Sequence, residues 1–319
     1  MVQSDIPPQL SIIVVSYNTR DMTLACLASV FAQTRTPFEV IVVDNASTDG
    51  SAEAIRAAFP QVRLMAETTN HGFAAAHRLA VPVARAPWLL LLNPDTVVLN
   101  GALDKLLAFA ERTPDAGIWG GRTLFGDGTL NPTSCWQRMT LASLVFRTLG
   151  LSGLMRSSEV FNAECYGTWP RDREREVDIV TGCLFLIRRA LWDRLGGFDD
   201  RFVMYGEEAD LCLRARALGV RPRITPEAEI IHYGGASEKV RTDKAARLLR
   251  AKIELIRRHF PPLTRGLGLT VFRLWPFSRY VGMGLAGRLL RRPGLVEQGR
   301  AWKEIWDRRA DWWNGLGSA

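Results

Sequence analysis

The sequence has few of the residues that build disulfide frameworks or zinc sites. Its 319 residues include five cysteines, an odd number that forms no C-x-x-C pair. This pattern favours neither a cross-linked nor a zinc-held structure, so we expect a reducing compartment. The N-terminus also lacks the basic and apolar regions of a signal peptide. Together these absences predict a cytoplasmic protein.

Two nucleotide-binding motifs and a membrane-spanning run are also missing. No G-x-G-x-x-G follows the first apolar run, and G-x-x-x-x-G-K-[ST] does not occur in the chain. Any bound phosphate groups therefore need another partner. Residues 266–290 are largely apolar, but Arg273, Arg279 and Arg288 interrupt them. The segment falls short of the ~20 uninterrupted apolar residues of a spanning helix, so we expect it not to cross a bilayer.

The composition indicates a large folded protein. Apolar residues make up 47% of the chain and charged residues 23%, which excludes a disordered chain and suits one large α/β domain with an appended piece. The formal net charge is +8, and the basic excess lies toward the C-terminus. This charge suggests an anionic partner: a nucleotide, an acidic polymer or a lipid surface. Charge alone does not choose among them.

The most informative stretch is residues 88–92 with the three residues that follow. Five consecutive apolar residues predict a strand buried on both faces, as in the middle of a parallel sheet. Pro94 cannot donate to the ladder, so pairing should end there and leave Asp95 just past the strand's carboxyl end. Open α/β sheets bind ligands at that edge, where a carboxylate is a good ligand for a hard cation. An ordinary cap or turn at residues 93–95 is the structural alternative.

Before this stretch, apolar runs typical of strands lie at residues 10–15, 38–43 and 62–65. They alternate with segments whose apolar residues recur at helical spacing. Such alternation predicts right-handed crossovers and a parallel sheet, so the strand ends should converge on one edge.

The polar residues at these strand ends suit a nucleotide. Ser16, Tyr17 and Asn18 offer backbone groups and an aromatic face, and Asp44 offers a carboxylate for a base or a ribose. A divalent cation at Asp95 would hold the phosphates. A well-capped turn is the alternative explanation of residues 44–50.

Four motifs then occur in order along the chain. They are Ser16-Tyr17-Asn18, Val42-Val43-Asp44-Asn45-Ala46-Ser47-Thr48-Asp49-Gly50, Asn70-His71-Gly72-Phe73-Ala74-Ala75-Ala76 and Leu91-Leu92-Asn93-Pro94-Asp95. Their order and spacing resemble the GT-A-fold glycosyltransferases of family two, most of all the rhamnosyltransferase-like bacterial branch. The resemblance covers roughly residues 9–260.

The resemblance implies an α/β fold with a Rossmann-like, mostly parallel central sheet flanked by helices. It also implies residue roles: Asp44 contacts the nucleobase, Asn70 lines the nucleotide pocket, and Asp95 is the last acid of the aspartate-x-aspartate metal motif. Asn93 stands where that motif has its first acid, so we expect Asn93 to take a weaker part.

A second group of acids lies at residues 207–210. Three acids open a helix there, and the simplest explanation is that they complement the helix dipole and that Asp210 pairs with Arg214. In the family that the chain resembles, the catalytic base is the second acid of a Glu-Asp pair, which falls on Glu208. Glu207 is the alternative base, and Asp210 is expected to contact the acceptor or to position the helix.

His232 ends a strand pattern at residues 221–231. A single histidine in this place is commonly structural. In similar enzymes it completes the metal site with the acid that matches Asp95, and this ligand set would suit Mn²⁺ or Mg²⁺.

We expect a catalytic domain over residues 1–260 and a C-terminal helical extension over residues 261–319. Arginines interleaved with aromatic residues at 266–313 suit either peripheral contact with the inner face of the cell membrane, or a helical hairpin packed on the catalytic domain or on a second subunit.

Two function classes follow. The first is an inverting, metal-dependent glycosyltransferase that moves a sugar, rhamnose among the candidates, from a nucleotide-sugar donor to a glycan or lipid-linked acceptor in cell-surface polysaccharide synthesis. The second is a non-catalytic protein that binds nucleic acid or an acidic glycan, but no nucleic-acid module is visible and we expect no nucleic acid.

Overall fold

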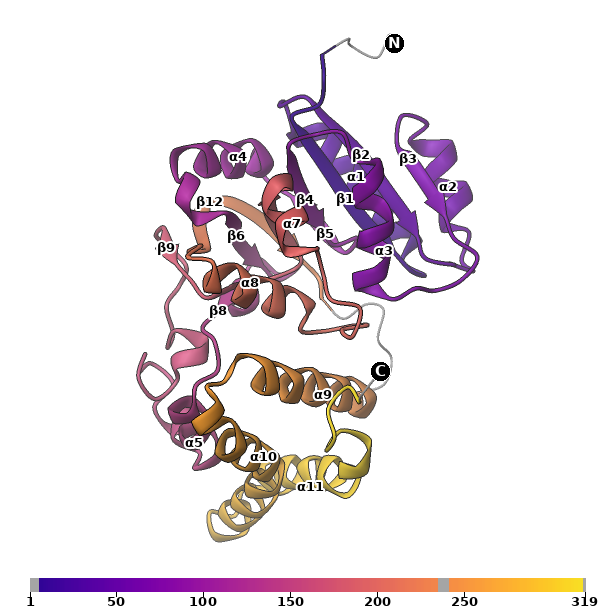
Figure 1. Ribbon diagram of the computed structural model, residues 1–319. Coiled ribbons are helices and arrows are strands. Elements are labelled where there is room, and N and C mark those ends of the chain that lie inside the picture. The colour runs from indigo at the N-terminus through magenta and orange to yellow at the C-terminus, as the bar shows by residue number, and fades with distance from the viewer. Residues whose placement is uncertain (1–5, 235–240, 318–319) are drawn as a thin grey trace. The chain divides into compact units, whose positions relative to one another are not determined.

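The computed structural model describes residues 6–234 and 241–317, and only the backbone of residues 241 and 242. Contacts divide the chain into two compact units (Figure 1). The first unit comprises Met1–Trp136 and Pro170–Ser237, and the second comprises Gln137–Trp169 and Glu238–Ala319. The division by contacts therefore does not fall at residue 260, because the helix over residues 241–259 groups with the C-terminal helices. The assignment of residues 1–260 as the catalytic domain stays a prediction.

The first unit is an α/β structure. Its strands are β1 (Leu10–Ser16), β2 (Phe38–Asp44), β3 (Arg63–Ala66), β4 (Trp88–Leu92), β5 (Thr96–Val98), β6 (Ile118–Leu124), β7 (Leu130–Asn131), β8 (Cys135–Trp136), β9 (Arg175–Glu176), β10 (Ile179–Val180), β11 (Leu184–Arg188) and β12 (Arg223–His232). Its helices are α1 (Arg20–Gln33), α2 (Ser51–Ala58), α3 (Phe73–Ala80), α4 (Ala102–Arg112), α7 (Arg189–Leu195) and α8 (Glu207–Ala217), with short 3-10 turns η1 (Val81–Val83), η2 (Pro114–Ala116) and η3 (Pro132–Ser134).

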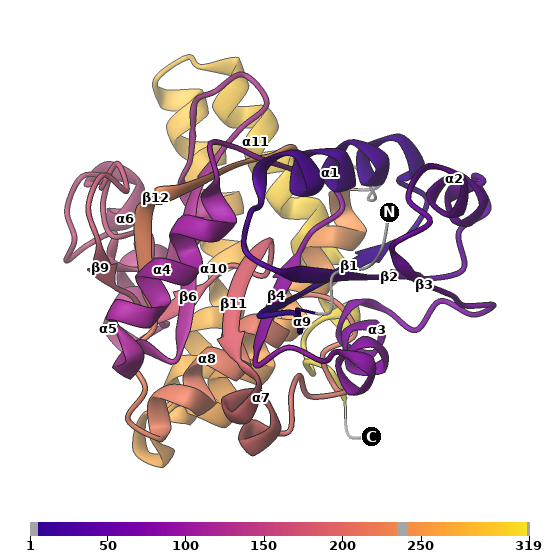
Figure 2. The same ribbon diagram turned by 90° about the horizontal axis from the view of Figure 1, so that it is seen from above.

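The central sheet has the order β3-β2-β1-β4-β11-β6-β12-β5. Its first half, from β3 to β4, is parallel, as the alternation of strands and helices predicts. Helices α1 and α2 cover one face of this half, and α3 covers the other (Figure 2). Strand β11 runs antiparallel to both of its neighbours, β4 and β6. The expected α/β fold with a central sheet flanked by helices is confirmed.

The register brings the strand ends to one edge. Ser16 lies opposite Asp44, and Leu92 lies opposite Val14, so the residues that follow β1, β2 and β4 meet at the same place. All five side chains of β4 are buried, in agreement with a strand that has no solvent face. The convergence predicted from the strand pattern is therefore confirmed.

The second unit is helical. Its elements are α5 (Leu141–Thr148), α6 (Leu151–Leu154), η4 (Ala163–Cys165), α9 (Arg241–His259), α10 (Pro262–Leu289), α11 (Pro293–Asp307) and η5 (Arg309–Asp311). Helices α10 and α11 form a close hairpin, because a Cβ placed on Gly299 would lie only 3.0 Å from the backbone nitrogen of Gly284. None of the helices in the described part of the chain combines the length and hydropathy that crossing a bilayer would take.

Aromatic side chains build the core of the second unit. Phe272 and Trp312 are fully buried, and Trp302 packs on Trp275 with 4.9 Å between ring centroids. Trp306 packs on Phe277 at 5.2 Å. These rings contact each other inside the unit, so an intramolecular helical hairpin accounts for the interleaved aromatic pattern.

Candidate active site

The loop after β1 is fixed by its own polar side chains. The Ser16 hydroxyl is fully buried and lies 3.2 Å from Thr19 Oγ1 and 2.9 Å from Thr23 Oγ1. Asn18 accepts from the Thr48 backbone N–H at 2.8 Å and so ties this loop to the loop after β2. The Tyr17 side chain is 40% exposed. Of these three predicted nucleotide contacts, the side chains of Ser16 and Asn18 already form hydrogen bonds within the protein, whereas the Tyr17 side chain is accessible to a ligand.

Asp44 lies at the end of β2 with its side chain buried. Burial raises the pKa of this carboxyl, and hydrogen bonds from Ser47 oppose the rise. Its Oδ1 atom is buried and has no hydrogen-bond partner among the residues that the structure describes. A buried acceptor without a donor is costly in a folded protein. An N–H group of a bound nucleobase would satisfy this atom.

A network of two asparagines holds the loop at residues 70–72. Asn45 Nδ2 donates to Asn70 Oδ1 at 2.9 Å, and Asn45 Oδ1 accepts from the His71 backbone N–H at 2.9 Å. Asn70 Oδ1 also accepts from the Gly72 backbone N–H. Asn70, predicted to line a nucleotide pocket, thus depends on a buried neighbour that the site prediction did not include. In the sequence, only the position of Asn45 directly after Asp44 pointed to this role. An ordinary turn-forming asparagine would occupy the same position, so the sequence did not distinguish the two.

The predicted metal ligands lie next to each other. His232 Nε2 is 3.3 Å from Asp95 Oδ1 and 3.4 Å from Asn93 Nδ2. The pairing of β12 with β5 places His232 opposite Thr96, and the Tyr233 backbone N–H donates to the Asp95 carbonyl at 3.0 Å. Two ligands in adjacent positions of an octahedral ion with bonds of ~2.1 Å are about 3.0 Å apart. The separation of Asp95 and His232 therefore fits a shared divalent cation.

The surroundings of this pair fit a cation that the substrate helps to hold. In the described residues, no cluster of three or more His, Cys, Asp and Glu side chains is arranged around a metal position. Mg²⁺ and similar ions commonly take one or two protein ligands together with substrate phosphates and water. Asn93 Oδ1 is buried without a partner among the described residues, so the donor set also contains an unused amide oxygen.

His232 is strongly affected by its neighbours. Burial lowers its pKa, but the charges and hydrogen bonds of Cys183 and Asp95 outweigh burial and raise the pKa to about 10. The Asp95 carboxylate is therefore the acceptor that faces Nε2 of the imidazole. A cation at this place would replace the proton and keep the same partners.

Residues 182 and 183 connect this pair to the acids of α8. The Cys183 carbonyl accepts from the Asn93 backbone N–H at 3.2 Å, and its thiol hydrogen-bonds to His232. A Cβ placed on the preceding Gly182 would lie 3.9 Å from the Cβ of Glu208. Glu208 and the Asp95–His232 pair therefore border the same short segment.

The two glutamates at the start of α8 have different surroundings. Glu207 is buried, and burial together with the charge of Glu208 raises its pKa well above the ordinary value. Burial also raises the pKa of the half-exposed Glu208, against hydrogen bonds from the backbone N–H groups of the first turn. Glu207 therefore holds its proton more tightly than an ordinary glutamate, and the less buried Glu208 is the acid that can exchange a proton with a bound molecule.

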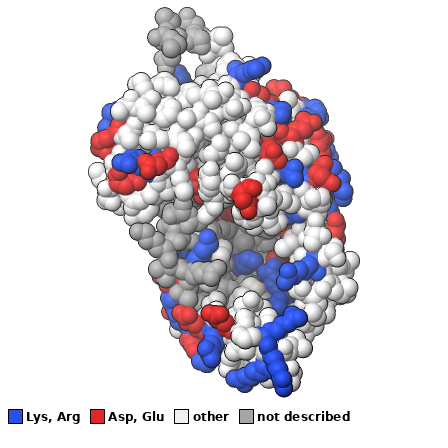
Figure 3. Space-filling view, turned by 180° about the vertical axis from the view of Figure 1, so that it is seen from behind, with Lys and Arg blue, Asp and Glu red and all other residues white. Residues whose placement is uncertain are grey.

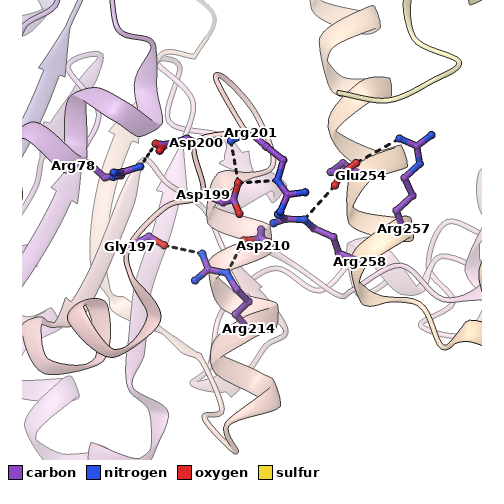
Figure 4. Close-up of polar contacts among 10 residues, drawn as sticks. All are labelled: Arg78, Gly197, Asp199, Asp200, Arg201, Asp210, Arg214, Glu254, Arg257 and Arg258. Atoms are coloured by element: carbon purple, nitrogen blue, oxygen red, sulfur yellow. Dashed lines mark hydrogen bonds and ion pairs between the residues drawn. The ribbon is translucent and has the colours of Figure 1, made fainter. Parts of the chain in front are cut away.

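Asp210 faces a different partner. Its carboxylate pairs with Arg214 Nε at 2.7 Å and is fully buried. The same guanidinium donates to the carbonyl of Leu195, the last residue of α7, and to the carbonyl of Gly197 just after it; Figure 4 shows the Gly197 contact. Asp210 therefore sits in a clamp that fixes α8 to the end of α7.

Comparison with known proteins gives a consistent result. Residues 11–195 match the family model described as "Glycosyl transferase family 2". The N-acetylglucosaminyl-diphospho-decaprenol L-rhamnosyltransferase of Mycobacterium tuberculosis is 28% identical over 248 residues, which cover 70% of this chain and 76% of that protein. The O-antigen biosynthesis protein RfbC of Myxococcus xanthus is 32% identical over 240 residues, which cover 73% of this chain and 18% of that protein.

Two solved structures share the fold. The mannosyltransferase PcManGT from Pyrobaculum calidifontis, in complex with GDP-Man and Mn²⁺, has a TM-score of 0.59 at 18% identity and aligns over 98% of this chain and 86% of its own. S. aureus TarS residues 1–349, in complex with UDP-GlcNAc, has a TM-score of 0.54 at 16% identity over 97% and 82%.

Proposed function

The chain belongs to glycosyl transferase family 2 and is a glycosyltransferase, and from this premise we propose that it moves a sugar from a nucleotide-sugar donor to a glycan or lipid-linked acceptor. The observation that carries the proposal is the segment at residues 182 and 183, which lies beside Glu208 and accepts a hydrogen bond from Asn93, next to the Asp95–His232 pair. Membership in an enzyme family argues against the alternative of a non-catalytic protein that binds nucleic acid or acidic glycan.

The donor would bind along the carboxyl edge of the sheet. The unpartnered Oδ1 of Asp44 would accept from the nucleobase, and the exposed ring of Tyr17 offers a stacking face. The loop that Asn45 and Asn70 hold together would form the adjoining wall. Each of these groups comes from a loop that the register of β1, β2 and β4 brings to this edge.

We infer that Asp95 and His232 hold a divalent cation, Mn²⁺ or Mg²⁺, and that Asn93 supports it. When bound, such an ion would neutralise the charge that develops on the departing diphosphate. The protein supplies one carboxylate and one imidazole 3.3 Å apart, and donor oxygens would complete the ligand set.

A sugar transfer that inverts the configuration of the anomeric carbon needs one catalytic base. The Glu208 carboxylate would take the proton of the acceptor hydroxyl as that oxygen bonds to the anomeric carbon and the bond from this carbon to the diphosphate oxygen breaks. The raised pKa of Glu208 suits proton transfer near neutral pH. Glu207 would stay neutral behind it, and Asp210 would position α8 through Arg214.

The acceptor and the sugar are proposed from the relatives' names. One relative is named as a rhamnosyltransferase that acts on a diphospho-decaprenol, and another as an O-antigen biosynthesis protein. We therefore favour rhamnose as the sugar and a lipid-linked acceptor in cell-surface polysaccharide synthesis. The protein would meet such an acceptor at the inner face of the membrane by peripheral contact through residues 266–313.

The test is a pair of substitutions. Asp95→Ala should abolish metal-dependent binding of the donor, whereas Glu208→Gln should keep donor binding and lose transfer. A screen of nucleotide sugars by thermal shift, with and without Mn²⁺, would identify the donor. A fully active Asp95→Ala enzyme would overturn the proposal.

A further inference from the structure

One face of α10 carries apolar side chains that are exposed to solvent, although the ring of Phe277 among them also packs on Trp306. They recur at intervals of three, four, seven or eight residues, which places them on a single stripe along the helix. Their side chains are between 41% and 97% exposed: Leu263, Leu267, Leu274, Phe277, Leu285 and Leu289. We call these six residues the α10 stripe. Exposed apolar surface of this extent and regularity marks an interaction site.

The opposite face of the helix is already occupied. Phe272 and Trp275 of α10 lie in the core of the second unit, and Gly287 packs against Val296 of α11. The tryptophans of the C-terminal segment also face this core, since Trp312 is fully buried and Trp302 packs on Trp275. The stripe, rather than the tryptophans, is therefore the apolar surface left to meet a partner.

The charge around the stripe is positive. Helix α10 contains no acidic residue, and Arg288, Arg291 and Arg292 are exposed where it ends. The second unit as a whole has 21 Lys and Arg residues against nine Asp and Glu, a net charge of +12, although the complete chain has a net charge of +8. Lysine and arginine side chains gather on the part of the surface in Figure 3 that corresponds to the helices of this unit in Figure 1.

We propose that the α10 stripe inserts into the interface of an anionic phospholipid membrane, with the helix lying flat and Arg288, Arg291 and Arg292 at the phosphate groups. A long helix with one apolar face, a basic terminus and no acidic residue suits this position. A second copy of the chain fits less well, because it would bring two units of net charge +12 together. The inference rests on the proposed lipid-linked acceptor and names the side chains that would reach its membrane.

Vesicle sedimentation with the full chain tests the stripe. Wild type should bind vesicles that contain phosphatidylglycerol, whereas Leu267→Ser, Leu274→Ser and Leu285→Ser together should lower the apparent partition coefficient by about tenfold or more. Leu79→Ser is the matched control, because Leu79 is a similarly exposed leucine of the first unit and its loss should leave binding unchanged. Equal binding by the wild type and the triple variant would overturn the inference.

The arginines give a second readout. Replacing Arg288, Arg291 and Arg292 with Gln should weaken binding to anionic vesicles by about a hundredfold but leave the weaker binding to pure phosphatidylcholine unchanged, since each basic side chain near the surface contributes about 1 kcal/mol, or fivefold. Raising the salt concentration should reproduce this effect on the wild type. Equal affinity of the wild type for neutral and anionic vesicles would refute the role of charge.

Two further measurements separate this inference from the proposed function. The variant with the three leucine substitutions should transfer sugar to a short-chain, water-soluble acceptor at the wild-type rate, because the stripe lies outside the catalytic residues. Failure of vesicle binding with normal transfer would overturn the inference alone, and absence of transfer by a vesicle-bound wild type would overturn the proposed function alone. A stable wild-type dimer that the triple substitution dissociates would assign the stripe to a second copy instead.

Discussion

The imidazole Nε2 of His232 lies 3.3 Å from the Oδ1 atom of Asp95, although one residue ends β12 and the other precedes β5. The antiparallel pairing of these two strands produces the contact, since it sets His232 opposite Thr96. The pairing of the two strands therefore brings these side chains into reach of each other. Every prediction about the metal follows from this contact.

The first prediction concerns the metal. His232→Ala should weaken Mn²⁺-dependent binding of the donor by about a hundredfold or more, because even the outer partners of metal ligands commonly contribute 10–100-fold. Thermal shift with Mn²⁺ and the nucleoside diphosphate measures this effect. His259→Ala is the control, since His259 ends α9 in the second unit, is not one of the proposed site residues, and should leave the metal response intact. An unchanged response in His232→Ala would remove this residue from the site.

The second prediction concerns the base. Glu208→Gln should lower kcat by ~10²–10⁴-fold and leave the donor KM nearly unchanged, because a glutamine keeps the shape but cannot take a proton. In the wild type, kcat should fall as the pH drops through the raised pKa of Glu208, where the carboxylate becomes protonated. Steady-state kinetics from pH 5 to 9 check both effects. A Glu208→Gln enzyme with the wild-type pH profile would assign the base to another acid.

The stability of the fold should depend on the protonation of Glu207. Its folded-state pKa is raised above the unfolded value by burial and by the charge of Glu208. The unfolded chain therefore ionises first, and the free energy of unfolding falls as the pH rises from about 4.5. Glu207→Gln should remove this loss and be more stable than wild type at pH 8 but not at pH 4. Urea unfolding at the two pH values measures the difference, and a variant that is less stable at pH 8 would contradict the assignment.

His77 should make stability depend on pH in the opposite direction, with stability lost as the pH falls. Its ring is buried on α3, and burial lowers its pKa to about 4. The unfolded chain binds a proton from about pH 6.5 downward, so stability is complete above that pH and is lost as the pH falls toward 4. The full effect is up to about 3 kcal/mol. In urea unfolding, His77→Gln should show a flatter loss of stability between pH 6.5 and 4 than wild type, and an equally steep loss would refute this role.

The parts of the site that sequence could predict are those set by local rules. Parallel strands separated by helices must end at one edge, so Asp44 and Asp95 could be placed there before the fold was known. The antiparallel direction of β11, and the contact of the preceding Cys183 with Asn93, depend on pairing between distant segments, which periodicity does not report. The C-terminal tryptophans show the same limit, because the spacing of Trp302 did not distinguish a buried face from a membrane face.

The last prediction concerns Asn45, which sequence reasoning passed over. Its amide bridges Asn70 and the His71 backbone, so Asn45→Ala would remove two hydrogen bonds and lower stability by about 1–3 kcal/mol, since each such bond contributes about 0.5–1.5 kcal/mol. The Phe73 backbone N–H at the end of the same loop donates to the Val203 carbonyl, in the segment before α8. Loss of Asn45 should therefore raise the donor KM and also lower kcat.

A double-mutant cycle distinguishes this network from two independent contacts. Asn45→Ala and Asn70→Ala should each raise the donor KM, and the double variant should be little worse than either single one, because both break the same 2.9 Å hydrogen bond. Asn162→Ala is the matched control, since this asparagine donates to the Arg156 carbonyl in the second unit and lies outside the Asn45–Asn70 contact, so it should leave the donor KM unchanged. Additive effects of the two asparagines on KM would mean that the loop at residues 70–72 contacts the donor without help from Asn45.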